Sequence, residues 1–133
     1  MRIFVAGASG VLGRQLVPLL AGAGHEVVGT TTSSRKLETL RALGAQPVVL
    51  DVLDAEAVGR AISEADPEVV VHEATALSGV GGNFRKFDET FAQTNRLRRE
   101  GTDNLLAAAL AVGARKLVAQ SMRAGPLRAR VRP

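Results

Sequence analysis

A glycine-rich turn near the amino terminus constrains the fold of this chain more than any other feature. The apolar run 2–6 leads into Gly7, and Gly7, Gly10 and Gly13 recur at three-residue intervals before leucines at helical spacing. Between a strand and a helix, the first glycine permits a sharp bend, the second lets a pyrophosphate approach the backbone, and the third permits close helix–strand packing. The free N–H groups at the helix start favour phosphate. Glycines that only shape a tight turn are the alternative explanation.

The rest of the chain alternates short apolar runs with helical patterns. Five runs are predicted to be strands: 2–6, 26–30, 46–50, 68–72 and 116–120. Such alternation with short connections predicts an α/β fold, a doubly wound parallel sheet of order 3-2-1-4-5 that is truncated at its carboxyl end. Within the helices, we expect Asp54 to be an N-cap and Pro18 to cause a kink or to occupy an exposed position. We also expect a helix break near Asn95.

Composition and charge argue against several classes of function. The chain has no Cys and two His, so no metal site is expected. No apolar run approaches the ~20 residues of a membrane helix, and the amino terminus is too short and glycine-bounded to be a signal peptide, so we expect a cytoplasmic protein with no membrane partner. Four of the 17 basic residues lie in 123–133, and the other 13 balance the 13 acidic residues. No nucleic-acid partner is therefore expected.

The candidate cofactor-binding residues follow the first four predicted strands. They are Gly7, Ser9, Gly10, Val11, Leu12 and Gly13, then Thr31 and Arg35, then Asp51 and Val52, and finally Ala74, Thr75 and Ala76. Thr30 or Thr31 occupies the position where an acidic residue would bind the adenosine ribose of NAD. The run 32–36, rich in hydroxyls and then basic, suits the 2′-phosphate of NADP. A helix N-cap followed by solvated charges explains that run equally well, so NADP or NAD is expected, with NADP favoured.

Three further side chains have both a functional and a structural interpretation. Asp51 could accept a hydrogen bond from the adenine amino group or cap the next helix. His72 and Glu73 look like an acid–base pair, but neighbouring strand residues point to opposite faces. We therefore interpret His72 and Glu73 as structural.

Taken together, these features resemble the extended or atypical short-chain dehydrogenases, the NAD(P)-dependent epimerase/dehydratase group. The resemblance covers residues 1 to about 121 and rests on five segments: the glycine loop 7–13, Asp51-Val52, and the segments 72–76, 101–109 and 116–121. It implies an NAD(P)-binding Rossmann domain at 1–121, from an oxidoreductase or epimerase acting on a small carbonyl, hydroxyl or sugar-like substrate. A non-catalytic NADP-binding regulatory or redox-sensing module is the alternative.

Two departures from the family pattern matter. Asn95 lies further from Gly101-Thr102 than the family's Asn-x-x-Gly-Thr allows, so the resemblance does not fix which residue takes the asparagine's place. The family's catalytic Tyr-x-x-x-Lys, in which Tyr exchanges the proton and Lys lowers its pKa, has no counterpart in a chain without Tyr. We therefore expect no catalytic residue here, with Ser121 at most a substrate contact, and an inactive fragment.

The family pattern stops abruptly after Ser121. Residues 122–133 include four Arg and two Pro, a composition that a GC-rich gene yields when it is read in a shifted frame. We expect these residues to be a non-native or disordered tail. The apolar surface left uncovered beside such a tail would favour a homodimer.

Overall fold

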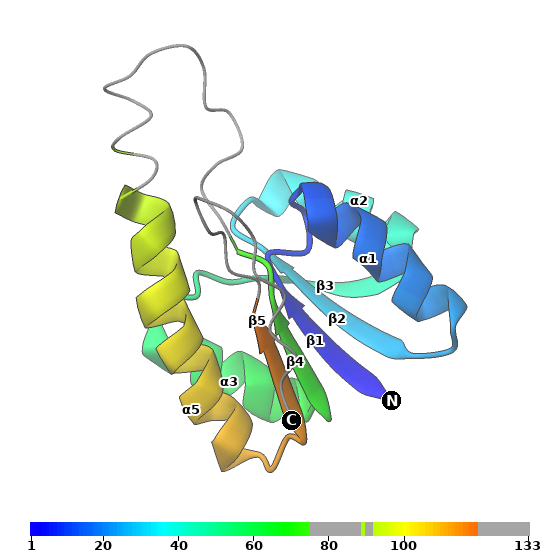
Figure 1. The fold of residues 1–133 in the computed structure, drawn as a ribbon. Helices are drawn as coiled ribbons and strands as arrows, with labels where there is room; N and C mark the ends of the chain where they lie inside the picture. The colour runs from blue at the N-terminus through cyan, green and yellow to red at the C-terminus, as the bar shows by residue number, and fades with distance from the viewer. Residues whose placement is uncertain (75–88, 90–91, 120–133) are drawn as a thin grey trace, which may run out of the picture.

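Five parallel strands form the centre of the structure, in the order β3-β2-β1-β4-β5 (Figure 1). They are β1 (Arg2–Ala6), β2 (Glu26–Thr31), β3 (Ala45–Val49), β4 (Val69–His72) and β5 (Lys116–Ala119). The computed structural model describes residues 1–74, 89 and 92–119, and every strand pair among them is parallel. The predicted fold class and strand order are confirmed, with strand ends displaced by a residue in places.

Helices cover both faces of the sheet (Figure 1). On one face lie α1 (Val11–Gly22) and α2 (Leu37–Leu43), the latter preceded by the 3₁₀ turn η1 (Ser34–Lys36). On the other face lie α3 (Ala55–Ala65) and α5 (Thr102–Ala111), which is preceded by the π-helical turn η2 (Leu97–Gly101). This division follows from right-handed crossovers between parallel strands.

Two apolar clusters, one on each face, hold these layers together. Along β1 the side chains alternate: Ile3 and Val5 pack with Val17 and Leu40 under α1 and α2. Phe4 packs on the opposite face with residues of α3 and α5. Because β1 is central and buried on both faces, it appears in the sequence as an unbroken apolar run.

The helix boundaries agree with most of the local signals in the sequence. Asp54 is the N-cap of α3, where its Oδ1 accepts a hydrogen bond from the Ala57 N–H at 3.1 Å. Pro18 lies inside α1 at an exposed position, which was one of its two expected placements. The predicted break near Asn95 is wrong, because helical backbone runs from residue 92 through η2 into α5. An Arg96–Glu100 ion pair, four residues apart on the helix surface, supports this polar stretch.

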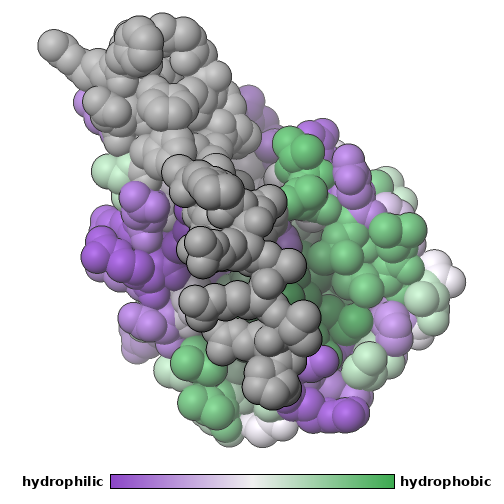
Figure 2. Space-filling model, viewed as in Figure 1, coloured by the Kyte–Doolittle hydropathy of each residue, from purple (hydrophilic) through white to green (hydrophobic). Residues whose placement is uncertain are grey.

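Several large apolar side chains are exposed on α1. Val11, Leu12 and Leu19 are 61%, 46% and 71% exposed. Figure 2 shows apolar side chains gathered on the right-hand side of the molecule, over α1. Within the part of the chain that the structure describes, no helix is long and apolar enough to cross a membrane.

Candidate functional site

A cavity of about 460 Å³ opens where β1, β2, β3 and β4 end. Its walls come from the glycine loop and the start of α1, from the residues after β2, β3 and β4, and from η2. The volume lies within the usual range for small-molecule sites, and ligands of open α/β sheets bind at this carboxyl edge. A smaller cavity of about 380 Å³ is lined by Arg2, Glu26, Gly44 and others near the amino ends of the strands, away from the glycine loop.

Two of the three motif glycines are required by packing within the chain. Gly7 has φ +78°, and a Cβ there would lie 2.5 Å from the backbone of Ala74 at the end of β4. A Cβ on Gly13 would lie 2.5 Å from the carbonyl oxygen of Ala8. These glycines let the loop lie against the residues after β4 and let α1 pack on Ala8 in the loop, so their presence needs no ligand to explain it.

Gly10 is different, because nothing in the described chain requires glycine there. Its φ of −74° is accessible to any residue, and a Cβ would meet only the Gly7 carbonyl oxygen, at an ordinary 3.5 Å. Gly10 lines the cavity and is the N-cap of α1, where it provides no side-chain cap and no acidic residue follows in the first turn. Val11 and Leu12 also line the cavity, and among the described residues no side chain accepts a hydrogen bond from the first N–H groups of α1, as an anion site requires.

The two threonines at the end of β2 fix the shape of the glycine loop. Thr30 Oγ1 accepts a hydrogen bond from the Gly7 N–H at 3.1 Å. Thr31 Oγ1 accepts from the Ser9 hydroxyl at 2.9 Å and from the Ser33 N–H at 3.2 Å. Thr31 is 3% exposed, so the position that would carry an acidic residue for NAD is here a buried hydroxyl engaged with the loop.

Two basic side chains also contribute to the cavity lining. Lys36 at the end of η1 and Arg14 on α1 both contribute to its lining. Arg35 is exposed and is not among the lining residues, so the structure places its neighbour Lys36 in the wall instead.

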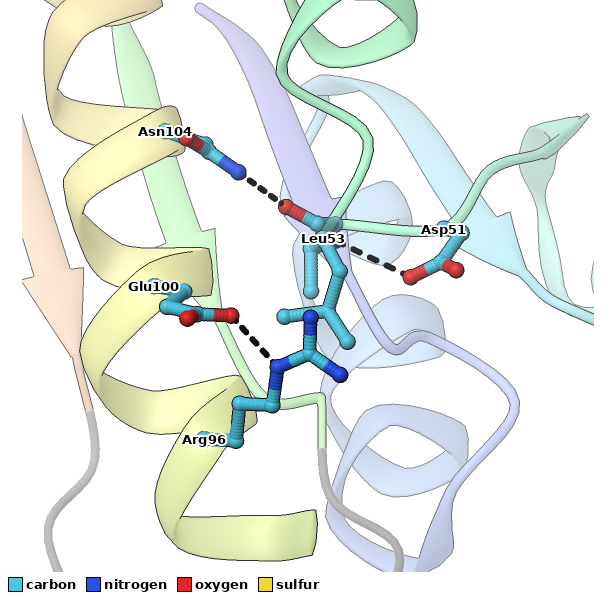
Figure 3. A network of polar contacts seen from close by, with 6 residues as sticks. Asp51, Leu53, Arg96, Glu100 and Asn104 are labelled. Atoms are coloured by element: carbon cyan, nitrogen blue, oxygen red, sulfur yellow. Dashed lines mark hydrogen bonds and ion pairs between the residues drawn. The ribbon is translucent and has the colours of Figure 1, made fainter.

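Asp51 and Val52 line the cavity beyond β3. Asp51 Oδ1 accepts a hydrogen bond from the Leu53 N–H at 2.9 Å, and the capping role at α3 belongs to Asp54. The Val52 carbonyl accepts from Asn104 Nδ2 at 2.8 Å, so α5 is tied to the loop after β3 (Figure 3). This bond fixes the cavity wall between the two elements.

Both nitrogens of His72 are engaged by backbone groups. Nε2 lies 3.1 Å from the Leu97 carbonyl oxygen, and Nδ1 lies 3.3 Å from the Ala74 N–H, so the ring donates at Nε2 and accepts at Nδ1. Burial lowers the pKa of His72, and the nearby charge of Arg98 lowers it further, against the opposing effect of the Leu97 bond. A neutral, doubly hydrogen-bonded ring is not a free base, which agrees with the structural interpretation.

Glu73 and Ala74 complete the wall at the end of β4. Partial burial raises the pKa of the Glu73 carboxyl. The other expected residues at this edge, Thr75, Ala76 and Ser121, lie outside the described residues, as does the segment 122–133. Among the described residues no group of three or more His, Asp or Glu is placed to hold a metal ion.

The structure thus brings most of the predicted cofactor residues to one cavity and adds others. The predicted residues that line it are Gly7, Ser9, Gly10, Val11, Leu12, Thr31, Asp51, Val52 and Ala74. Gly13 is buried beneath the loop, where its function is packing. Sequence reasoning missed Leu97 and Arg98 on η2, although the irregular spacing between Asn95 and Gly101 marked this segment as unusual.

Comparison with known proteins gives one consistent result. Residues 3–124 match the family model described as the NAD dependent epimerase/dehydratase family. A 3-diazoavenalumate denitrifying reductase from a Streptomyces species is 50% identical over 123 residues, which are 92% of this chain and 38% of that protein.

Solved structures agree with the sequence match. The Bordetella bronchiseptica enzyme WbmG in complex with NAD and UDP is 26% identical with a TM-score of 0.68, over 90% of this chain and 36% of that one. A UDP-glucose 4-epimerase from Thermotoga maritima, solved with UDP-glucose, is 25% identical with a TM-score of 0.72, over 90% and 37% of the two chains. The chain spans little more than a third of the length of these relatives.

Proposed function

This chain belongs to the NAD-dependent epimerase/dehydratase family, and from that premise we propose that it binds NADP or NAD in the cavity at the carboxyl edge of its sheet. The dinucleotide would lie with its diphosphate over Gly10, Val11 and Leu12, and with its adenosine half near Thr31, Asp51 and Val52. Structures of relatives that contain bound NAD support this placement.

The observation that carries the proposal is the unexplained glycine at position 10. Gly7 and Gly13 avoid clashes inside the chain, but among the described residues a Cβ at position 10 would meet only the Gly7 carbonyl oxygen, at an ordinary 3.5 Å. A glycine that only shaped a turn would need a special φ or a crowded site, and Gly10 has neither. A ligand that rests directly on the backbone there supplies the missing reason.

We further propose that NADP is preferred over NAD. Thr31 is a hydroxyl where a carboxylate would bind the ribose 2′-OH and repel a phosphate, and Lys36 lines the adjacent wall. Arg35, exposed on η1 beside Lys36, remains in the proposed site as a second cation at the rim. Because ammonium and guanidinium groups bind phosphate strongly, this corner suits a 2′-phosphate.

We also propose an activity for the whole protein. A bound nicotinamide would supply hydride transfer, and the substrate would be a small carbonyl, hydroxyl or sugar-like molecule, as the reductase and epimerase relatives suggest. We assign residues 1–121 to the NAD(P)-binding domain, with Thr75 and Ala76 beside the cofactor and Ser121 at most beside the substrate. We place the protein in the cytoplasm and propose homodimer formation through apolar surface such as that of α1.

Gly10→Val tests the proposed site directly. Calorimetric titration of the chain with NADP and with NAD is expected to show weak binding, with NADP bound at least as tightly. In Gly10→Val the affinity for both is expected to fall by about tenfold or more, because the side chain occupies the place of the diphosphate. The thermal midpoint should change little, because Val tolerates the backbone conformation at that position.

Gly59→Val is the matched control for this experiment. It makes the same change on α3, where a Cβ has no neighbour within 4 Å, and should leave the affinity unchanged. Unchanged affinity in a folded Gly10→Val chain would show that the loop is only structural. A clear preference for NAD would overturn the NADP assignment alone.

A further inference from the structure

Three arginines lie close together at the start of η2, and the structure gives each a different environment. Arg96 forms an ion pair with Glu100 on the helix surface, with Nε and Oε2 2.7 Å apart (Figure 3). Arg99 is exposed. Arg98 is half-buried, lines the cavity, and forms no ion pair within the part of the chain that the structure describes. A partly desolvated guanidinium without a carboxylate favours an anionic ligand.

The backbone that carries Arg98 is fixed from two sides. The Leu97 carbonyl accepts the hydrogen bond from His72 Nε2, which attaches the start of η2 to the end of β4. At the other end of the turn, Gly101 is so close to its neighbours that a Cβ would lie 2.9 Å from Val52 Cγ2 and 3.1 Å from His72 Nε2. Burial lowers the pKa of His72, and the charge of Arg98 lowers it further.

Arg98 approaches the cavity from the side opposite the glycine loop. The loop leads into α1 on one face of the sheet, whereas η2 continues into α5 on the other face (Figure 1). The strand ends lie between these two walls. Lys36 lines the cavity from η1 beyond β2, where we propose the adenosine ribose. Arg98 and the uncapped N-terminus of α1 thus flank the position proposed for the diphosphate.

The sequence spacing also singles out Arg98. Arg98 lies three positions before Gly101-Thr102, the place of the asparagine in the Asn-x-x-Gly-Thr pattern. Asn95, the asparagine that the sequence does contain, is exposed and is not among the lining residues. The chain therefore presents a cation where the family pattern has a neutral amide.

We propose that Arg98 binds the diphosphate of the dinucleotide and, with the N-terminus of α1, clamps it from both faces of the sheet. This inference rests on the proposed cofactor function. A guanidinium can donate two parallel hydrogen bonds to phosphate oxygens, which fixes the orientation of the diphosphate as well as neutralising its charge.

Ligand fragments separate this role from other phosphate contacts. We would titrate the full 133-residue chain with NADP, NAD, ADP and adenosine, and compare Arg98→Gln with Arg99→Gln as the matched control. Arg98→Gln is expected to weaken NADP, NAD and ADP alike by about tenfold or more, and to leave adenosine unchanged. Arg99→Gln should change none of these affinities, and Arg98→Lys should restore part of the loss. Lys36→Gln should weaken NADP more than NAD.

Each other outcome contradicts a specific claim. Equal affinities in Arg98→Gln and Arg99→Gln, with NAD bound by the parent chain, would overturn the role of Arg98 and leave the proposed function standing. If Arg98→Gln weakened the affinity for NADP alone, Arg98 would contact the 2′-phosphate instead of the diphosphate. If it weakened the affinity for adenosine equally, the role of Arg98 would be structural. Failure of the parent chain to bind NADP or NAD would overturn the proposed function itself.

Discussion

The imidazole of His72 donates one hydrogen bond and accepts another, both with backbone groups, and so must be neutral to make both. Protonation would place a second donor against the Ala74 N–H and add a charge beside Arg98. Burial holds the pKa of His72 below its ordinary value of 6.5, and the charge of Arg98 lowers it further, against the opposing effect of the Leu97 hydrogen bond. The ring therefore works as a structural link between β4 and η2.

Acid is expected to weaken the fold through His72. The unfolded chain takes up the proton near the ordinary pKa of 6.5 and the folded chain only at lower pH, so this stability is complete above 6.5 and is lost as the pH falls below it. His72→Gln, which does not titrate, should flatten the decline in the urea midpoint between about pH 7 and pH 5. Any contribution of Glu73 is common to both proteins and cancels in the difference.

His25→Gln is the control at the residue scale, because it removes the other histidine of the chain. In His25→Gln the urea midpoint should still fall between about pH 7 and pH 5, because His72 is unchanged. Identical pH profiles for the parent chain and His72→Gln would contradict the assignment of a neutral, buried ring.

At the scale of single elements, the π turn η2 depends on the absence of a side chain at Gly101. Gly101→Ala is expected to destabilise the chain by about 1–3 kcal/mol, because its Cβ would press on Val52 and His72. Gly59→Ala on α3 is the opposite case, with open space around the Cβ, and is expected to stabilise by about 0.5–1 kcal/mol. Chemical denaturation of both variants and the parent chain measures these changes. Equal stabilities of Gly101→Ala and Gly59→Ala would show that η2 has room for the added Cβ.

The same turn shows where sequence reasoning reaches its limit. The central strands β1 and β4 could be predicted because their burial leaves unbroken apolar runs, and the loop residues because they adjoin a recognisable glycine spacing. The polar run 95–100 has no apolar period, so a helix held by an ion pair and by contacts with His72 looked like a break. Arg98 was missed for that reason. The choice between Arg35 and Lys36 depends on side-chain directions in a 3₁₀ turn, which composition does not reveal.

At the scale of the whole molecule, we expect the chain to bind the cofactor without catalysing a reaction. The chain holds the proposed dinucleotide cavity but contains no Tyr, so no phenol is available to exchange the substrate proton. The chain would be incubated with reduced or oxidised cofactor and a panel of small carbonyls, alcohols and nucleotide sugars. We expect no turnover when the reaction is followed by nicotinamide absorbance. Turnover that disappears in Ser121→Ala would contradict this expectation.

The position of β1 at the middle of the sheet has a consequence for how the chain is made. During synthesis β1 is made before both of its partners: it pairs on one side with β2, about two dozen residues later, and on the other with β4, where Ile3 pairs with Val69. Until that second partner is synthesised, one edge of β1 has no strand beside it, and Phe4 lacks its contacts with Val70 and Leu105. A nascent chain that pauses before residue 69 would therefore expose both an unpaired edge and half of a hydrophobic core, which is the state that chaperones recognise and that aggregates most readily.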